Sequence, residues 1–316
     1  MYDCYFAGSG SSVTTAEVRR LGCNQLLSQL NERRAVLDWV QYLKEHPECK
    51  CKLFIDSGAY SAHTKGVEVD VDEYINFMNE IDEYVTIYAQ VDTSPGRFGQ
   101  PRTEEDIREA PRKSWENYLY MISKAKSPDK VIPVYHQGED IKWLKNMLEF
   151  RHPDGHPIQY IGISSAKDQS VQSNFSWLKQ VYKVIAESSN PNVKTHGFGI
   201  MVQNFIEQFP FTSSDSTTWI MAGANGSVMT PYGTICISDR QLHKKDNFFN
   251  MPKESQTNLR EYFKKFDSTP EELSSDAVAR MLYHIRYLKD WQDNHVYRGN
   301  NLFKKTLINL NNTDKE

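Results

Sequence analysis

Short apolar runs alternate repeatedly with helical patterns along this sequence, and this alternation limits the possible folds. The runs are rich in β-branched and aromatic residues, and helical patterns of apolar residues separate most of them. We expect strands at 3–8, 24–30, 51–56, 85–92, 130–136, 158–164, 193–199 and 210–214. Eight such units in about 215 residues match the size of an α/β TIM (β/α)8 barrel. A doubly wound open sheet is the alternative, because strand periodicity alone does not exclude it.

The pattern changes after this series. Residues 217–237 are expected to form a hairpin that turns at Asn225-Gly226. We therefore predict a barrel domain over residues 1–222, followed by a C-terminal hairpin and helical extension over residues 223–316 that packs on the barrel.

Two helix starts have recognisable capping residues. Asn31 is expected to cap the helix that follows the second strand. Thr269 is expected to be the N-cap of a C-terminal helical segment, with Pro270 at its first position.

The composition limits the class of protein. An apolar content of 39% in 316 residues indicates a globular chain with a substantial core. A net charge of −4 excludes strong overall basicity, so any nucleic-acid contact must use local patches. No stretch reaches the ~18 apolar residues of a membrane span, and the N-terminus does not resemble a signal peptide. We expect a cytoplasmic protein.

The five cysteines are an odd number in a long chain, which favours reduced thiols. Cys49 and Cys51 form a C-x-C pair, and Cys23 is a further candidate neighbour. No fourth ligand follows at a usual zinc spacing. We favour thiols that flank the start of a strand, and a metal site at these three cysteines is the alternative.

Three carboxylates come at or just after expected strands. Asp56, Asp92 and Asp215 follow the third, fourth and eighth runs. In a TIM barrel the carboxyl ends of all strands meet at one rim, where the chemistry takes place. Strand-end polar residues also commonly cap the next helix. The other polar groups expected at this rim are His136, Gln137, Ser164, Ser165 and His196.

These residue types suit glycosyl chemistry. A retaining mechanism needs one carboxylate as nucleophile and a second group that donates and then accepts a proton. Asp215 and Asp56 are candidates for these two roles, which leaves Asp92 to bind the substrate. Tyr60 offers an aromatic face, and Gln137 both donates and accepts hydrogen bonds. A flat heterocycle suits this set.

Six motifs, in chain order, resemble the tRNA-guanine transglycosylase superfamily. The similarity runs from about residue 3 to residue 222 and is closest to the phage and bacterial 7-deazaguanine DNA transglycosylases. The feature that most favours this DNA branch is DSTTW after HGFG. The motifs are FIDSGAYSAHTKG (54–66), YAQVD (88–92), VYHQGED (134–140), YIGIS (160–164), HGFG (196–199) and FTSSDSTTW (211–219).

The resemblance implies a pentosyltransferase on a TIM barrel that replaces guanine in DNA with a 7-deazaguanine, such as preQ0 of the queuosine-related bases. It implies no cofactor. Asp215 would be the nucleophile at C1′, and Asp56 would protonate the leaving guanine and deprotonate the incoming base. Asp92 would accept hydrogen bonds from N1–H and the 2-amino group.

Further base-binding residues follow from the same resemblance. Gln137 and the backbone around Gly162 would face the 6-oxo edge, and Tyr60 would stack on the base. Ser57, beside Asp56, is included in this base-binding set. His196 stands where the tRNA enzymes tend to have an apolar residue, so it either tunes which deazaguanine fits or is a hydrogen-bonded strand-end histidine.

One departure concerns zinc. The tRNA enzymes have three cysteines and a histidine after the last strand, whereas this region offers only Cys236 and His243. We expect no metal there, which also weakens the case for tRNA. Exchange on tRNA, a retaining glycoside hydrolase and an inactive nucleic-acid-binding barrel remain alternatives. A phage-encoded enzyme would work in the host cytoplasm.

Basic residues in the rim loops are candidates for phosphate contacts. These residues are Lys65, Arg97, Arg102 and Lys167. Loop 94–102 contains two glycines and is a candidate flexible element over the substrate.

Overall fold

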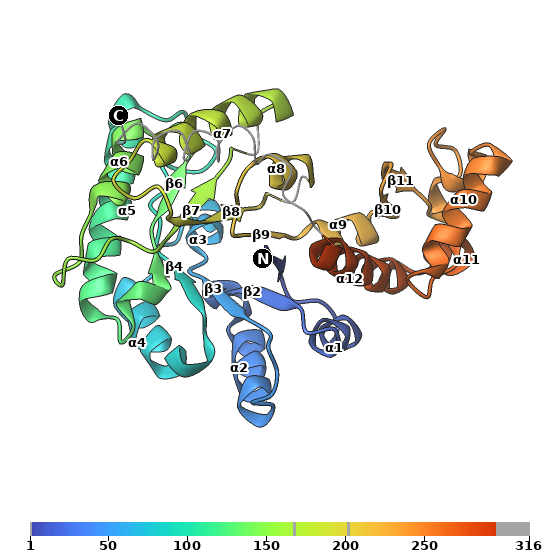
Figure 1. The fold of residues 1–316 in the computed structure, drawn as a ribbon, viewed down its shortest axis with the longest axis horizontal. Coiled ribbons are helices and arrows are strands. Elements are labelled where there is room, and N and C mark those ends of the chain that lie inside the picture. The colour runs from blue at the N-terminus through green and yellow to red at the C-terminus, as the bar shows by residue number, and fades with distance from the viewer. Residues whose placement is uncertain (1, 167–168, 201–202, 295–316) are drawn as a thin grey trace, which may run out of the picture.

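The computed structural model describes residues 2–166, 169–200 and 203–294 and shows a parallel α/β barrel of the TIM type (Figure 1). The sheet has nine strands in the order β5-β4-β3-β2-β1-β9-β8-β7-β6. This confirms the predicted fold class. The strands are β1 (Asp3–Ala7), β2 (Asn24–Ser28), β3 (Leu53–Asp56), β4 (Ile87–Ala89), β5 (Val131–Ile132), β6 (Val134–His136), β7 (Tyr160–Ser164), β8 (Lys194–Phe198) and β9 (Ser213–Ser216).

The strands at the two ends of the sheet order, β5 and β6, are separated by a single residue of the chain. β5 pairs with β4, β6 pairs with β7, and only Pro133 separates β5 from β6 in the chain. Proline has no N–H to donate, so it interrupts the ladder. Its carbonyl oxygen still accepts a hydrogen bond of 2.7 Å from the N–H of Gly162. The expected strand at 130–136 thus divides into β5 and β6, which lie on the two sides of the seam where the barrel closes.

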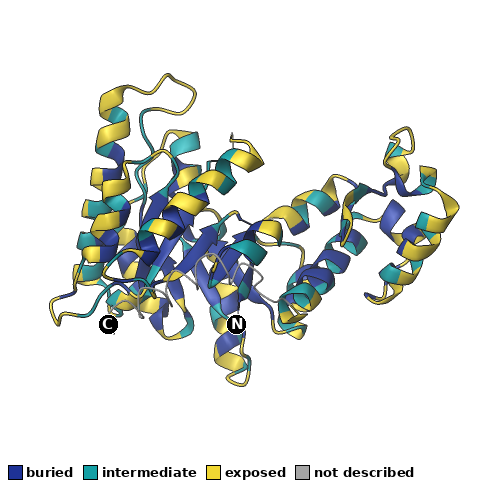
Figure 2. Cartoon of the chain, turned by 45° about the horizontal axis from the view of Figure 1, so that its top comes forward, coloured by how far each residue is buried: buried dark blue, intermediate teal, exposed yellow. Residues whose placement is uncertain are grey.

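Helices cover the outside of the barrel, and Figure 2 shows their exposed faces turned away from the buried strands. In α7, Leu178, Tyr182 and Ile185 are buried at helical spacing, which turns one face of the helix toward the barrel. A smaller apolar cluster, which includes Tyr5 and Phe54, fills the barrel interior. The helices of this part are α1 (Ser12–Arg20), α2 (Gln29–Glu45), α3 (Ala59–Lys65), α4 (Val71–Ile81), α5 (Glu104–Lys124), α6 (Ile141–Glu149), α7 (Val171–Ala186) and α8 (Gln203–Gln208).

The start of α2 differs from the sequence prediction. The helix begins directly after β2, with Ser28 rather than Asn31 as N-cap. Glu32 has non-helical dihedral angles (φ −132°, ψ 25°) and marks a kink. The Glu32 carboxylate accepts a hydrogen bond of 3.0 Å from the N–H of Ser28. This bond ties the irregular first turn back to the end of the strand.

The predicted hairpin turn at Asn225-Gly226 is wrong. Residues 218–224 form α9 (Thr218–Ala224), which Gly226 follows in the left-handed conformation (φ +79°). The hairpin comes later and consists of β10 (Ser227–Thr230) and β11 (Gly233–Cys236). Buried Trp219 favours the helix, because its indole N–H donates a 3.0 Å hydrogen bond to the carbonyl of Ala7 at the end of β1.

The C-terminal extension contains α10 (Lys253–Lys264), α11 (Pro270–Ser275) and α12 (Ala277–Asn294). Thr269 caps α11 in a capping box with Glu272, and Pro270 is its first residue, as predicted. α12 packs against α9, α1 and β1, whereas α10, α11 and the hairpin lie away from the barrel (Figure 1). The domain boundary at residue 222 stays a prediction. No helix in the described ranges is long and apolar enough to cross a membrane.

Candidate active site

Three carboxylates gather at the carboxyl ends of the strands. Asp56 is the last residue of β3, Asp92 lies three residues beyond β4, and Asp215 lies within β9, one residue past the expected strand end. Burial and the charge of Asp92 raise the pKa of Asp56 to about 7, and the charge of Asp215 contributes in the same direction. Both other acids are therefore near Asp56, which can exchange a proton close to neutral pH.

One oxygen of Asp215 is firmly held. Its Oδ1 accepts a hydrogen bond of 2.9 Å from the N–H of Gly199 and lies 3.2 Å from Nε2 of His196. Among the described residues, no hydrogen bond reaches Oδ2. The side chain is only 10% exposed. This arrangement orients the carboxylate and leaves one oxygen for another partner.

His196 belongs to the layer beneath Asp215 in the barrel interior. Its side chain is fully buried, and its ring packs edge-on against Phe54 and Phe198 at centroid distances of 4.6 and 4.5 Å. Its Nδ1 lies 2.6 Å from Oγ of Ser213, which lies 2.5 Å from the hydroxyl of Tyr160. The contacts suit a residue that positions Asp215 more than one that touches a base. They also give the hydroxyl of Ser213, two residues before Asp215, a structural role.

Asp92 is held by His136, which the sequence places at this rim, and by Gln90, which the predicted site does not include. Its Oδ1 accepts a hydrogen bond of 2.6 Å from Nε2 of Gln90, and its Oδ2 lies 3.2 Å from Nε2 of His136. Burial alone would lower the pKa of His136, but Asp92 and Glu139 outweigh it and raise that pKa to about 10. An imidazolium between two carboxylates therefore fixes Asp92.

Gln90 has a second notable feature. It is buried, and its Oε1 has no hydrogen-bond partner among the described residues. A buried acceptor without a partner costs free energy, so a bound donor would be favoured beside Asp92. The sequence signal for Gln90 is its i, i+2 spacing from Asp92, which places both side chains on the same side of an extended segment.

Gln137 and Gly162 are less available than the resemblance implies. Oε1 of Gln137 accepts a hydrogen bond of 2.9 Å from the N–H of Ala166. Gly162 lies in the middle of β7, and its N–H is already bound to Pro133. A Cβ at Gly162 would lie 2.5 Å from the Phe198 ring, so packing inside the barrel requires glycine here.

A sharp turn connects Asp56 to α3. Gly58 is left-handed (φ +81°), and a Cβ there would lie 2.6 Å from Cβ of Leu30. Its N–H donates to Oδ2 of Asp56 at 3.1 Å. Ser57 is buried within this turn, whereas Tyr60, on the first turn of α3, is 58% exposed. Tyr60 thus has an accessible ring near the rim, whereas the side chain of Ser57 is not accessible there.

A cavity of about 760 Å³ adjoins the rim between α3, α4, α5 and the loop after β4. Asp92 and Arg97 line it, but Asp56 and Asp215 do not. The loop has no helix or strand between residues 92 and 103, and Phe98 at its tip is 60% exposed. The cavity therefore extends the site outward from Asp92.

The other predicted phosphate contacts are unevenly placed. Arg97 and Arg102 are exposed in the loop. Nζ of Lys65 donates to the side chain of Asn31 at 2.8 Å. Lys167 lies outside the described residues.

The cysteines are all free thiols. Burial raises the pKa of Cys23 to about 12, and the Cys236 thiol donates to Oε1 of Gln241 at 3.0 Å. Within the described chain, the cysteines do not join a group of three or more potential metal ligands.

Comparisons with known proteins give no family for this chain. No family model matches the sequence, and no curated protein matches it.

Proposed function

We propose that this protein is a base-exchange glycosyltransferase that replaces guanine in DNA with a 7-deazaguanine such as preQ0. The observation that supports it best is the rim with Asp56, Asp92 and Asp215, where the pKa of Asp56 is raised to about 7. Such a group can give up and regain a proton in one catalytic cycle.

In the first step, Oδ2 of Asp215 attacks C1′ of the target nucleotide. The bond between C1′ and the base nitrogen breaks, and the proton of Asp56 passes to the departing guanine. The Gly199 N–H and His196, both at Oδ1, keep the attacking carboxylate in one orientation. The product is an ester between Asp215 and the sugar.

The second step reverses the first with a new base. The ionised Asp56 accepts the proton from the ring nitrogen of the 7-deazaguanine, and this nitrogen attacks C1′. The ester bond breaks and Asp215 regains its charge. Atoms and protons balance without a cofactor or water, and water must be kept away because it would leave an abasic site.

Asp92 would select the base. Guanine and 7-deazaguanines present N1–H and a 2-amino group side by side, which one carboxylate can accept together. Each oxygen of Asp92 already has one partner and retains capacity for another hydrogen bond. The partnerless Oε1 of Gln90 would provide a further acceptor.

We favour DNA over tRNA as the substrate because the sequence contains the DSTTW motif. It also lacks the three cysteines and the histidine that the tRNA enzymes have after the last strand. A target C1′ is shielded within a duplex, so the nucleotide must leave the stack or come from a single strand. The loop after β4, with exposed Arg97 and Phe98, would contact the flanking strand.

The test is incubation with radiolabelled guanine and either DNA or tRNA. Label in DNA that depends on Asp215 supports the proposal. Label in tRNA alone would show that the substrate is tRNA, the alternative polymer. Label in neither polymer, together with hydrolysis of a glycoside, would assign the site to a retaining hydrolase.

A further inference from the structure

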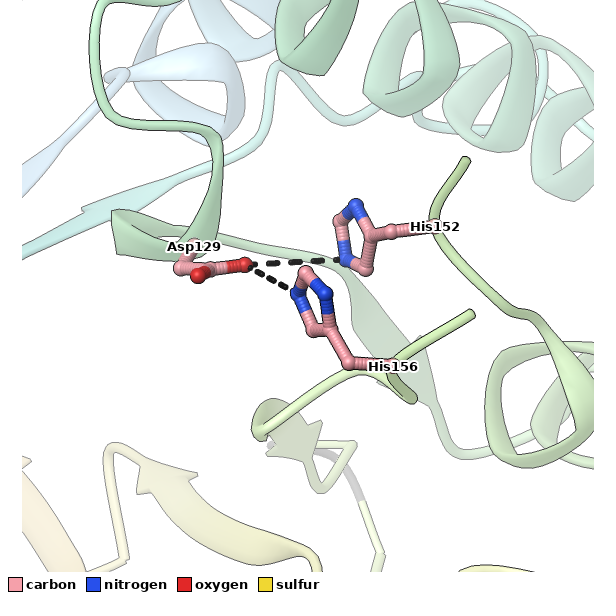
Figure 3. Close-up of side chains that lie close together, drawn as sticks. All are labelled: Asp129, His152 and His156. Carbon is pink, nitrogen blue, oxygen red and sulfur yellow. Dashed lines mark hydrogen bonds and ion pairs between the residues drawn. The ribbon is translucent and has the colours of Figure 1, made fainter. Parts of the chain in front are cut away.

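A second group of polar side chains lies at the opposite end of the barrel. Asp129 belongs to a 3₁₀ turn, η2 (Pro128–Lys130), directly before β5. His152 and His156 belong to the loop before β7 (Figure 3). Both strands begin at this end, so the group is separated from the carboxyl-terminal rim by the length of the barrel.

The loop brings the two histidines together. Residues 151 and 157 form an antiparallel bridge, and the N–H of His152 donates to the carbonyl of His156 at 2.9 Å. Gly155 completes the turn with φ +90°. The two imidazole rings stack at a centroid distance of 4.3 Å and an angle of 10°. Phe150 packs edge-on against His152 at 5.2 Å.

Both rings direct a nitrogen at the same oxygen. Nε2 of His156 lies 2.8 Å from Oδ1 of Asp129, and Nε2 of His152 lies 3.8 Å from it. The three potential ligand atoms lie within 4.8 Å of one another. Two imidazole nitrogens and one carboxylate oxygen form a ligand set suited to Zn²⁺, with water completing a tetrahedron.

A fourth residue, Asp154, supports this ligand set by holding the ring of His156 in place. Oδ1 of Asp154 is hydrogen-bonded to Nδ1 of His156, on the side of the ring away from Asp129. Metal-bound histidines commonly donate their other N–H to a carboxylate, which fixes the tautomer. With Nδ1–H donated to Asp154, Nε2 of a neutral His156 has a lone pair directed at Asp129. Two facing lone pairs are favourable only with a cation near them.

We propose that Asp129, His152 and His156 bind a structural Zn²⁺ ion that fastens the start of β5 to the start of β7. These strands flank the seam at Pro133, where the sheet has no ladder between β5 and β7. The ion would supply a connection where backbone hydrogen bonds are missing. The expectation of no metal rested on the cysteines, and local patterns do not reveal this group because Asp129 and His156 are 27 positions apart with α6 between them.

The alternative is a protonated His156 bonded to two carboxylates without metal. That arrangement accounts for His156, but it gives no reason for His152 to direct its Nε2 at the same oxygen. Metal binding separates the two possibilities.

The experiment uses chelator-treated full-length protein. Zn²⁺ titration by calorimetry should give one equivalent per chain. Co²⁺ should give the absorption of a tetrahedral nitrogen and oxygen site, without a thiolate charge-transfer band. Asp129→Asn and His156→Ala should each weaken binding at least about tenfold, and Asp154→Asn should weaken it less.

The matched control is His46→Ala. His46 pairs with Glu48 at 3.2 Å and, among the described residues, belongs to no group of three potential ligands, so its loss should leave metal affinity unchanged. Asp154→Asn keeps all three ligands and remains informative if the other variants fold poorly. Absence of binding, a thiolate band, or equal affinity in Asp129→Asn, Asp154→Asn and wild type would overturn the proposal. None of these readouts depends on base exchange.

Discussion

The two ends of the barrel use similar residues in different charge arrangements. At the carboxyl-terminal rim, Asp56 has two other acids near it, and its pKa rises to about 7. At the amino-terminal end, Asp129 faces two imidazoles that stack on each other. The first arrangement retains a proton that can be transferred, and the second is the group for which we propose Zn²⁺ binding.

The difference shows that residue type alone does not define a site. In TIM barrels, chemistry is found at the carboxyl ends of the strands, and the other end serves stability. The histidines of this protein illustrate the contrast between the two ends. His196 positions a candidate nucleophile, whereas His152 and His156 converge on one carboxylate oxygen.

The largest effect should come from Asp215→Asn. An amide cannot attack C1′, so labelled-base exchange should fall by about 10⁴-fold or more. Binding of Zn²⁺ at the other end should remain at one equivalent, which would separate the two regions functionally. The exposed acid variant Asp38→Asn is the activity control. Exchange retained in Asp215→Asn would exclude this residue as the nucleophile.

The pH dependence of exchange should report Asp56. Its raised pKa keeps the proton below about pH 7, so the rate of guanine release should fall as pH rises through 7. Asp56→Asn should be about 10²- to 10⁴-fold slower and should lack this limb. Single-turnover rates from pH 5 to 9 are the measurement. An unchanged limb in the variant would assign it to another group.

Asp92→Asn should have two smaller consequences. Loss of a bidentate acceptor should lower the preference for guanine over hypoxanthine by about ten- to a hundredfold. Loss of the neighbouring charge should lower the pKa of Asp56, which moves the alkaline limb to lower pH. Competition between the two bases and a pH series measure these effects. Unchanged selectivity would remove Asp92 from the base pocket.

Gly162→Ala tests the packing of the barrel interior, which separates the two ends. The new Cβ would crowd Phe198 and Val134, so unfolding free energy should fall by about 1–3 kcal/mol. Denaturant unfolding measures the change. Combining it with Phe198→Leu should recover part of the loss, because the smaller side chain leaves room. A single variant as stable as wild type would show that the barrel interior adjusts freely.

Much of the fold could be predicted because strand and helix periodicities are local. The eight expected strands and the capping box at Thr269 depend on nearby residues, and the structure has both. The helix start at Asn31 was wrong because the Glu32 carboxylate bonds back to the N–H of Ser28 and kinks the first turn. The hairpin turn at Asn225-Gly226 was wrong for the opposite reason. Contacts with distant residues, such as the bond from Trp219 to Ala7, favour the observed elements.

Local sequence patterns predicted the alternating strands and helices and placed the three acids near the carboxyl ends of β3, β4 and β9, because a few consecutive residues encode each strand end. They favoured a barrel but did not exclude an open sheet, since closure depends on strands far apart in the chain. Which side chains meet depends on the three-dimensional fold. The fold pairs Gln90 and His136 with Asp92, places His196 beneath Asp215, and brings Asp129 close to His152 and His156. Burial, electrostatic coupling and ligand geometry depend on distances in space, and barrel closure sets those distances between residues far apart in the chain.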